Sequence, residues 1–212
     1  MNDVLTSDRS SREIEIIRSA YRTMARRGSH RMSLQEVADE AGVSKALLFY
    51  HFGTKDALLL AAMQWAVERT AERIRAQLES GGSPPDQMAA LLDAIFIAPE
   101  ANREFYLFYL DLIEHAGRVP SFVGLTAMLN EIINGLYSEV ITNGARAGVF
   151  DVPDAEVAAR NMRALIEGTF LQWIQTDDWM TNHESWKEQC RAALLRLLGA
   201  AESDLNEGPR PS

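Results

Sequence analysis

Residues 33–58 have the sequence SLQEVADEAGVSKALLFYHFGTKDAL, which contains the signals for two short helices joined by a tight turn. Ser33 and Glu36 form a capping box, in which each side chain satisfies a backbone N–H at the start of a helix. Gly42 ends that helix, because glycine adopts the left-handed backbone conformation without a steric penalty. Ser44 is the N-cap of the second helix. The order of capped helix, glycine turn and capped helix predicts a helix-turn-helix motif.

The second helix of this motif carries side chains that suit DNA. In a helix-turn-helix the second helix enters the major groove, and its first residues contact base edges. Leu48 and Val43 are expected to fill the core between the two helices, which leaves Leu47 and Tyr50 on the opposite face beside Lys45. Lys45 suits a phosphate or a guanine, and Leu47 suits a thymine methyl group. The alternative is an ordinary solvated helix face.

The rest of the chain has a helical period, with no alternating strand pattern longer than four residues. The predicted fold class is all-α with about nine helices, which span about residues 10–27, 34–41, 44–52, 55–79, 86–97, 100–116, 120–145, 154–176 and 182–198. Residues 1–55 form a domain of three short helices, and residues 56–200 form a domain of longer helices. Residues 201–212, with a glycine and two prolines, are expected to form a flexible tail.

Charge is distributed unevenly along the chain. The 212 residues have a formal net charge of −9, which by itself argues against a nucleic-acid partner. Residues 1–55 nevertheless hold nine Lys and Arg against seven Asp and Glu, a net charge of +2. The remaining residues carry −11. The asymmetry is compatible with a DNA-binding N-terminal domain.

Several classes of protein are disfavoured by the sequence. Cys190 is the single cysteine, so neither an intrachain disulfide nor a zinc site of clustered cysteines is possible. The longest apolar run, residues 57–63, is far shorter than the roughly 20 residues that span a bilayer, and residues 1–13 lack the apolar core of a signal peptide. We therefore expect a cytoplasmic protein without a membrane partner.

Catalytic, cofactor-binding and metal-binding motifs were not found. The adjacent pairs Glu114–His115 and His183–Glu184 are expected to point to different sides of their helices, so that a metal site would need distant partners. No cofactor and no metal are therefore expected. An all-α enzyme is the disfavoured alternative of another class. Redox sensing by Cys190 is also disfavoured, because a lone cysteine on a helix is usually a small buried residue.

Residues 33–38 together with residues 41–58 resemble the DNA-binding signature of TetR-family transcriptional regulators. Ile14, Ala20 and Gly28 match features of the helix that precedes the motif in this family. The resemblance implies an all-α homodimer. It assigns residues 1–55 to DNA binding, and residues 56–200 to ligand binding and dimerisation.

The resemblance also implies which residues face DNA. Ser33 and Lys55 match phosphate contacts at helix N-termini. The wider predicted DNA-facing set is Ser33, Gln35, Ser44, Lys45, Ala46, Leu47, Tyr50, His51 and Lys55. Two positions depart from the family pattern: Ala46 replaces a usual Gly, and Phe49 replaces a usual Tyr that hydrogen-bonds to phosphate. We expect Phe49 to pack in the core, and Tyr50 to be placed to supply the missing hydroxyl.

The C-terminal domain is loosely similar to the BetI-like subgroup, at residues 144–150, Asp154 and residues 165–168. The expected dimer interface comprises Val157, Asn161, Leu165, Gly168, Gln172, Trp186, Cys190, Leu194 and Leu197. Candidate pocket residues are Trp65, Phe105, Phe108, Tyr109, His115, Met128, Asn161, Glu167, Phe170 and Trp173. An intrachain core is the alternative for both sets.

The leading hypothesis from the sequence is a ligand-responsive repressor. A homodimer would bind a pseudo-palindromic double-stranded operator and be released by a small, mainly hydrophobic effector of unknown identity. The long helix over residues 55–79 would be the lever, since it joins the two domains. A DNA-binding activator or regulator without a small-molecule effector is the main alternative.

Overall fold

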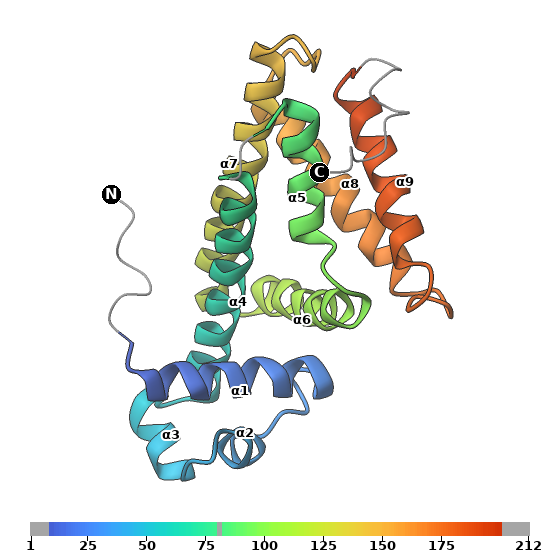
Figure 1. Ribbon diagram of the computed structural model, residues 1–212. Coiled ribbons are helices and arrows are strands. Elements are labelled where there is room, and N and C mark those ends of the chain that lie inside the picture. The colour runs from blue at the N-terminus through green and yellow to red at the C-terminus, as the bar shows by residue number, and fades with distance from the viewer. Residues whose placement is uncertain (1–8, 80–81, 201–212) are drawn as a thin grey trace. The chain divides into compact units, whose positions relative to one another are not determined.

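A computed structural model describes residues 9–79 and 82–200 of the chain. Within these ranges the secondary structure is helical, with nine α-helices, one short 3-10 helix and no strand (Figure 1). The helices are α1 (Ser11–Arg27), α2 (Leu34–Ala41), α3 (Lys45–Phe52), α4 (Lys55–Leu78), α5 (Pro84–Ile95), α6 (Pro99–Arg118), η1 (Pro120–Phe122), α7 (Val123–Arg146), α8 (Ala155–Trp173) and α9 (His183–Leu197). The prediction of an all-α fold with about nine helices is confirmed. The expected flexible tail, residues 201–212, lies outside the described residues.

Local capping explains where the first helices begin. The Ser10 hydroxyl accepts the N–H of Glu13, and the Glu13 carboxylate accepts the N–H of Ser10 in return. Ser33 and Glu36 form the same reciprocal pair at the start of α2, as the sequence predicts. Each box satisfies backbone groups that a helix start would otherwise leave without partners.

The chain forms two compact units. The first comprises the described residues up to Glu68 together with residues 107–126, and so contains α1, α2, α3, the start of α4 and the end of α6. Aromatic contacts join these elements: the Tyr21 ring lies 4.8 Å from that of Phe108 and 5.7 Å from that of Trp65, between ring centroids. The sequence places a domain boundary at residue 55. That boundary divides DNA binding from ligand binding and dimerisation, and it stays a prediction.

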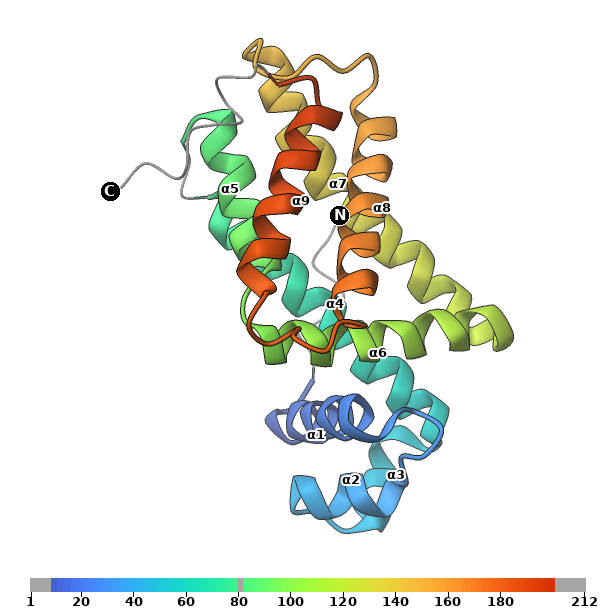
Figure 2. The same ribbon diagram turned by 90° about the vertical axis from the view of Figure 1, so that its right-hand side faces the viewer.

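The second unit comprises residues 69–106 and the described residues from Ala127 onward. Helices α8 and α9 lie side by side in it (Figure 2). Its core contains a stack of three rings, in which Phe170 lies 4.3 Å from Phe96 and 4.1 Å from Tyr106. Trp173 is also fully buried, and its indole N–H donates to the carbonyl oxygen of Trp179 over 2.8 Å.

No helix in the described part of the chain is long and apolar enough to cross a membrane.

Candidate nucleic-acid interface

The turn between α2 and α3 fixes the position of the second helix of the motif. Gly42 has φ 61° and ψ 40°, the left-handed conformation that glycine adopts without strain. The N–H of Val43 donates to the carbonyl oxygen of Ala38 over 2.9 Å, which closes the turn. Leu48 is 1% exposed and anchors α3 against the unit, as predicted. The helix-turn-helix geometry follows from these contacts.

The outer face of α3 carries four exposed side chains. Lys45 and Ala46 are exposed in its first turn, and Tyr50 is 83% exposed. The expectation that Phe49 packs in the core is wrong, because its side chain is 44% exposed and Leu48 takes the buried position. Phe49 lies one turn after Lys45, whose ammonium is 5.9 Å from the ring centroid. The face therefore combines a cation with two large rings, and sequence reasoning missed Phe49.

Two residues predicted to face DNA are partly covered by the protein. Leu47 is half-buried. His51 is also half-buried, and its Nδ1 lies 3.5 Å from a carboxylate oxygen of Glu13 on α1. The Glu13 pKa is lowered, mainly by hydrogen bonds from the backbone and side chain of Ser10, with His51 contributing less. His51 therefore holds α3 to α1 through one ring nitrogen.

Four further predicted contacts lie at or next to helix starts. The hydroxyl oxygens of Ser33 and Ser44 accept backbone N–H groups of their own helices, and each hydroxyl keeps its hydrogen to donate. Gln35 is exposed and donates to Asp39 over 2.8 Å, one turn along α2. Lys55 is half-buried in the first turn of α4.

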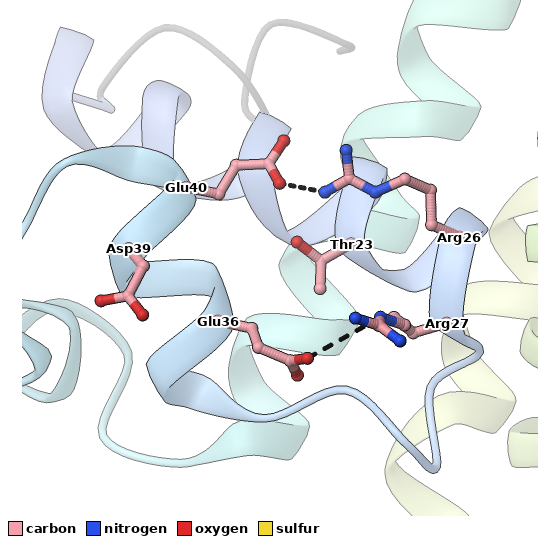
Figure 3. Close-up of a pocket in the computed structure, with 6 residues that line it drawn as sticks. All are labelled: Thr23, Arg26, Arg27, Glu36, Asp39 and Glu40. Atoms are coloured by element: carbon pink, nitrogen blue, oxygen red, sulfur yellow. Dashed lines mark hydrogen bonds and ion pairs between the residues drawn. The ribbon is translucent and has the colours of Figure 1, made fainter.

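A hollow lined mostly by charged side chains lies between α1 and α2 in the same unit, and its arginines pair with its glutamates (Figure 3). Glu40 accepts Arg22 over 2.9 Å and also binds Arg26, while Arg27 lies 3.8 Å from Glu36. Burial raises the Glu40 pKa, but the hydrogen bonds from Arg26 and Arg22 outweigh that effect and leave the pKa lowered. These arginines fasten α1 to α2, so part of the basic charge of residues 1–55 is structural.

The predicted dimer residues lie mainly on the outer surface of α8 and α9, around a shallow depression. Ala164, Leu165, Gly168, Thr169, Gln172, Trp186, Gln189, Cys190 and Ala193 line it. Val157 and Leu197 are exposed apolar residues on the same two helices. Leu194 is fully buried and Cys190 is only 2% exposed within their own chain, which assigns both side chains to the core of one subunit instead of the interface.

The candidate pocket residues are divided between the two units. Trp65, Phe108, Tyr109 and His115 belong to the first, and Phe105, Met128, Asn161, Glu167, Phe170 and Trp173 belong to the second. Asn161 is exposed on α8, in contrast to the fully buried Phe170 and Trp173, so these three do not line one buried pocket. Glu167 accepts Arg163 over 2.5 Å, and Arg163 also donates to Asn130.

Cys190 should react slowly with thiol reagents in the folded protein. Burial raises the pKa of its thiol to about 11, with a hydrogen bond to Thr169 opposing the shift. At pH 8 only about one thiol in a thousand is then the reactive thiolate. Mass spectrometry should find Cys190 largely unmodified by iodoacetamide under native conditions and fully modified in urea. Equal rates in both conditions would contradict a buried thiol and reopen a redox role.

Comparison with known proteins gives matches over both parts of the chain. The model of bacterial regulatory proteins of the tetR family matches residues 16–62, and the model of the BetI-type transcriptional repressor C-terminal domain matches residues 84–199. The HTH-type transcriptional regulator BetI of Brucella canis is 33% identical over 105 residues, which are 50% of this chain and 53% of that protein. The chain thus spans about half the length of that relative. BetI of Stenotrophomonas maltophilia is 26% identical over 162 residues, covering 76% and 80% of the two chains.

Solved structures give the same fold. A TetR transcription regulator from Haloarcula marismortui superposes with a TM-score of 0.76 at 26% identity, covering 90% of this chain and 98% of that one. A protein described as a transcriptional regulator from Saccharomonospora viridis, solved in complex with choline, superposes with a TM-score of 0.77 at 24% identity. That match covers 86% of this chain and 94% of the other, and shows the fold alone.

Proposed function

Because this chain belongs to the TetR family of bacterial transcriptional regulators, we propose that it is a ligand-responsive repressor that binds a pseudo-palindromic operator as a dimer. Membership of the family confirms the resemblance drawn from residues 33–58 and the prediction of a regulator rather than an enzyme. The repressor role, the dimer, the operator and the effector are parts of the proposal.

The outer face of α3 is the observation that carries the DNA-binding proposal. Lys45 supplies a cation at the start of the helix, where recognition helices meet base edges and phosphates. Tyr50 is 83% exposed, so most of its side chain is available to a partner. Its hydroxyl can donate to phosphate oxygen. Phe49 adds exposed apolar area to this surface, which suits contact with the thymine methyl groups of the DNA major groove.

The depression on α8 and α9 supports a dimer through these helices. Trp186 and Leu165 are half-buried there, and Val157 and Leu197 leave further apolar area exposed to solvent. A two-fold axis across this face would bury the same patch of each subunit. The two recognition helices would then address half-sites about 34–36 Å apart, one turn of DNA.

The proposed effector binds in the second unit, which holds Phe96 directly after α5 and the aromatic residues of α8 and of the first part of α6. Choline is the first compound to test, because the structurally similar S. viridis protein was solved with it. Rings such as Phe96, Tyr106 and Trp173 suit a quaternary ammonium through cation–π attraction, and because all three are buried, binding would require the ring stack to open. The small, mainly hydrophobic effector expected from the sequence is the second choice. A coupling of about 1–3 kcal/mol, roughly 5–150-fold in operator affinity, would make a working switch.

A regulator that has no small-molecule effector is the competing proposal. A thermal-shift screen with choline and uncharged apolar metabolites separates the two. An effector should raise the melting temperature and lower operator affinity at the same concentration. Operator binding that no compound in the screen changes, with no shift in melting temperature, would favour the regulator without an effector.

Operator binding is tested by selecting duplexes from a random pool and titrating the selected sequence at several salt concentrations. If each subunit neutralises about three phosphates, the log–log salt slope of the dimer should be near −5. Lys45→Ala should weaken binding and make the slope less steep, whereas Arg146→Ala, an exposed change at the end of α7, should alter neither. Equal binding to selected and random duplexes would refute sequence-specific recognition.

A further inference from the structure

The turn that follows α1 is fastened to α6 within the first unit. Gly28 ends α1 with φ 78°, and the next residue, Ser29, is buried. The N–H of Ser29 donates to a carboxylate oxygen of Asp111 on α6 over 2.7 Å. This bond holds the backbone of the turn against α6 and so places the backbone of the next residue, His30, beside that helix.

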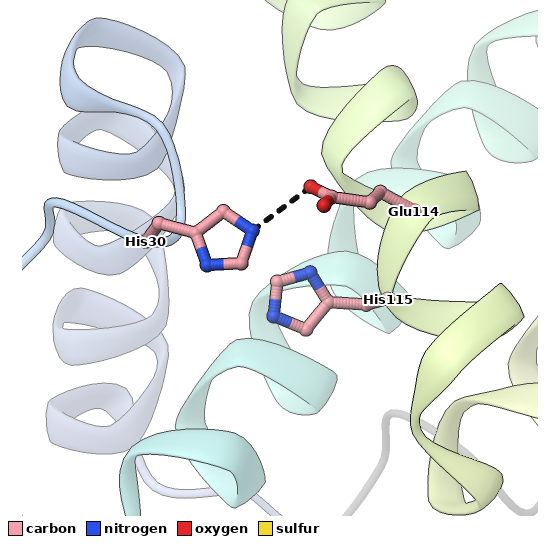
Figure 4. Close-up of side chains that lie close together, drawn as sticks. All are labelled: His30, Glu114 and His115. Atoms are coloured by element: carbon pink, nitrogen blue, oxygen red, sulfur yellow. Dashed lines mark hydrogen bonds and ion pairs between the residues drawn. The ribbon is translucent and has the colours of Figure 1, made fainter.

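Three potential metal ligands meet at this point (Figure 4). His30 Nε2 lies 2.9 Å from Glu114 Oε2, and the rings of His30 and His115 are stacked with centroids 5.4 Å apart. One ligand atom from each of the three residues lies within 4.8 Å of the others. Neighbouring residues on a helix are only about 100° apart, so Glu114 and His115 both reach His30. The expectation that they point to different sides is wrong.

A hydrogen bond to the backbone of α6 orients the His115 ring for binding a cation. His115 Nδ1 lies 3.0 Å from the carbonyl oxygen of Asp111, which can only accept, so Nδ1 is the donor and Nε2 is the nitrogen that a metal would use. Such a bond from a ligating histidine to a carbonyl oxygen is common in metal sites.

We propose that His30, Glu114 and His115 bind one divalent transition cation such as Zn²⁺. Two imidazoles and one carboxylate form a donor set that zinc accepts, with water in the fourth position. Bonds of about 2.0–2.1 Å place tetrahedral ligand atoms about 3.4 Å apart, so small side-chain rotations would close the site. The cation would replace the hydrogen that His30 and Glu114 share. Arg118, 3.4 Å from the other carboxylate oxygen, leaves Glu114 Oε2 for the metal.

A bound cation would cross-link the turn after α1 to α6. This turn leads directly into α2, the first helix of the DNA-binding motif, and α6 belongs to the same compact unit only in part. The site would therefore give the regulator an input that depends on metal concentration and is separate from the proposed effector. Because metal binding is measured without DNA, its outcome is independent of whether the operator proposal holds.

The test is titration of the metal-free protein, all 212 residues, with ZnCl₂ by calorimetry, and with Co²⁺ by absorption spectroscopy. We expect one cation per chain and the d–d bands of tetrahedral Co²⁺. Loss of an outer-sphere partner alone lowers metal affinity about 10–100-fold, so His30→Gln and Glu114→Gln should each lower it by more than about 100-fold. Glu139→Gln, which removes an exposed carboxylate from α7, should leave binding unchanged.

Proteolysis supplies a second measurement of the cross-link. Arg31 is an exposed trypsin site directly after His30, so Zn²⁺ should slow cleavage there in the native protein but not in Glu114→Gln. Absence of binding, or binding that the His30 and Glu114 variants leave unchanged, would overturn the proposal. Circular dichroism of each variant shows whether it is folded before the titration.

Discussion

Phe170→Ala should lower the free energy of unfolding by about 3–5 kcal/mol, the usual cost of truncating a buried aromatic residue. Phe170 is 0% exposed and stacks on both Phe96 and Tyr106. Removal of its ring takes away two aromatic contacts and leaves a cavity that helices α5, α6 and α8 can fill only by moving. Since domains are stable by only about 5–15 kcal/mol, this loss is a large share of the total.

Urea unfolding followed by circular dichroism measures the loss, at one fixed protein concentration because association adds to apparent stability. Met180→Ala is the matched control: Met180 is an apolar residue of the same unit, but its side chain is 53% exposed. The control should stay within about 0.5 kcal/mol of the native protein. A loss below about 1 kcal/mol for Phe170→Ala would contradict a close-packed ring stack.

The helix-turn-helix is predictable from sequence because its determinants are local. Ser33 caps α2 through a residue three positions away, and Gly42 ends the helix through its own backbone freedom. Such interactions are visible in the order of the residues. The predicted types and bounds of the helices are therefore close to those observed. Helix α5 begins at Pro84 instead of near residue 86, because Ser83 is its N-cap.

Positions that depend on tertiary packing were harder to assign. Phe49 was expected in the core because it lacks the hydroxyl with which the usual Tyr binds phosphate, but Leu48 is the buried residue of α3 and Phe49 is exposed. Leu194 was expected at the dimer interface but is buried in its own chain, and Asn161 was expected in the pocket as well as at the interface but is exposed, since the helical period gives a stripe without saying which neighbour covers it. His30 and Glu114 are 84 residues apart, and no spacing rule joins them.

Gly168→Arg should convert the proposed dimer into a monomer and lower operator affinity by about 100- to 10,000-fold, the range of gain that linking two binding modules provides. Gly168 lies in the depression on α8 and α9, and a Cβ built there meets nothing within 4 Å in its own chain. Arginine is also a better helix former than glycine by several tenths of a kcal/mol, so a single subunit should keep its fold.

The substitution acts only if the α8 and α9 face meets a second copy. At a two-fold interface through this face each new guanidinium would be buried, and burying a charge without an acidic partner opposes association. Gly135→Arg is the control, because Gly135 lies on an exposed part of α7 and a Cβ there also has open space. Light scattering at micromolar concentration should find a dimer for the control and a monomer for Gly168→Arg. A dimer in both would place the interface elsewhere, and a monomeric native protein would remove the dimer from the proposed mechanism.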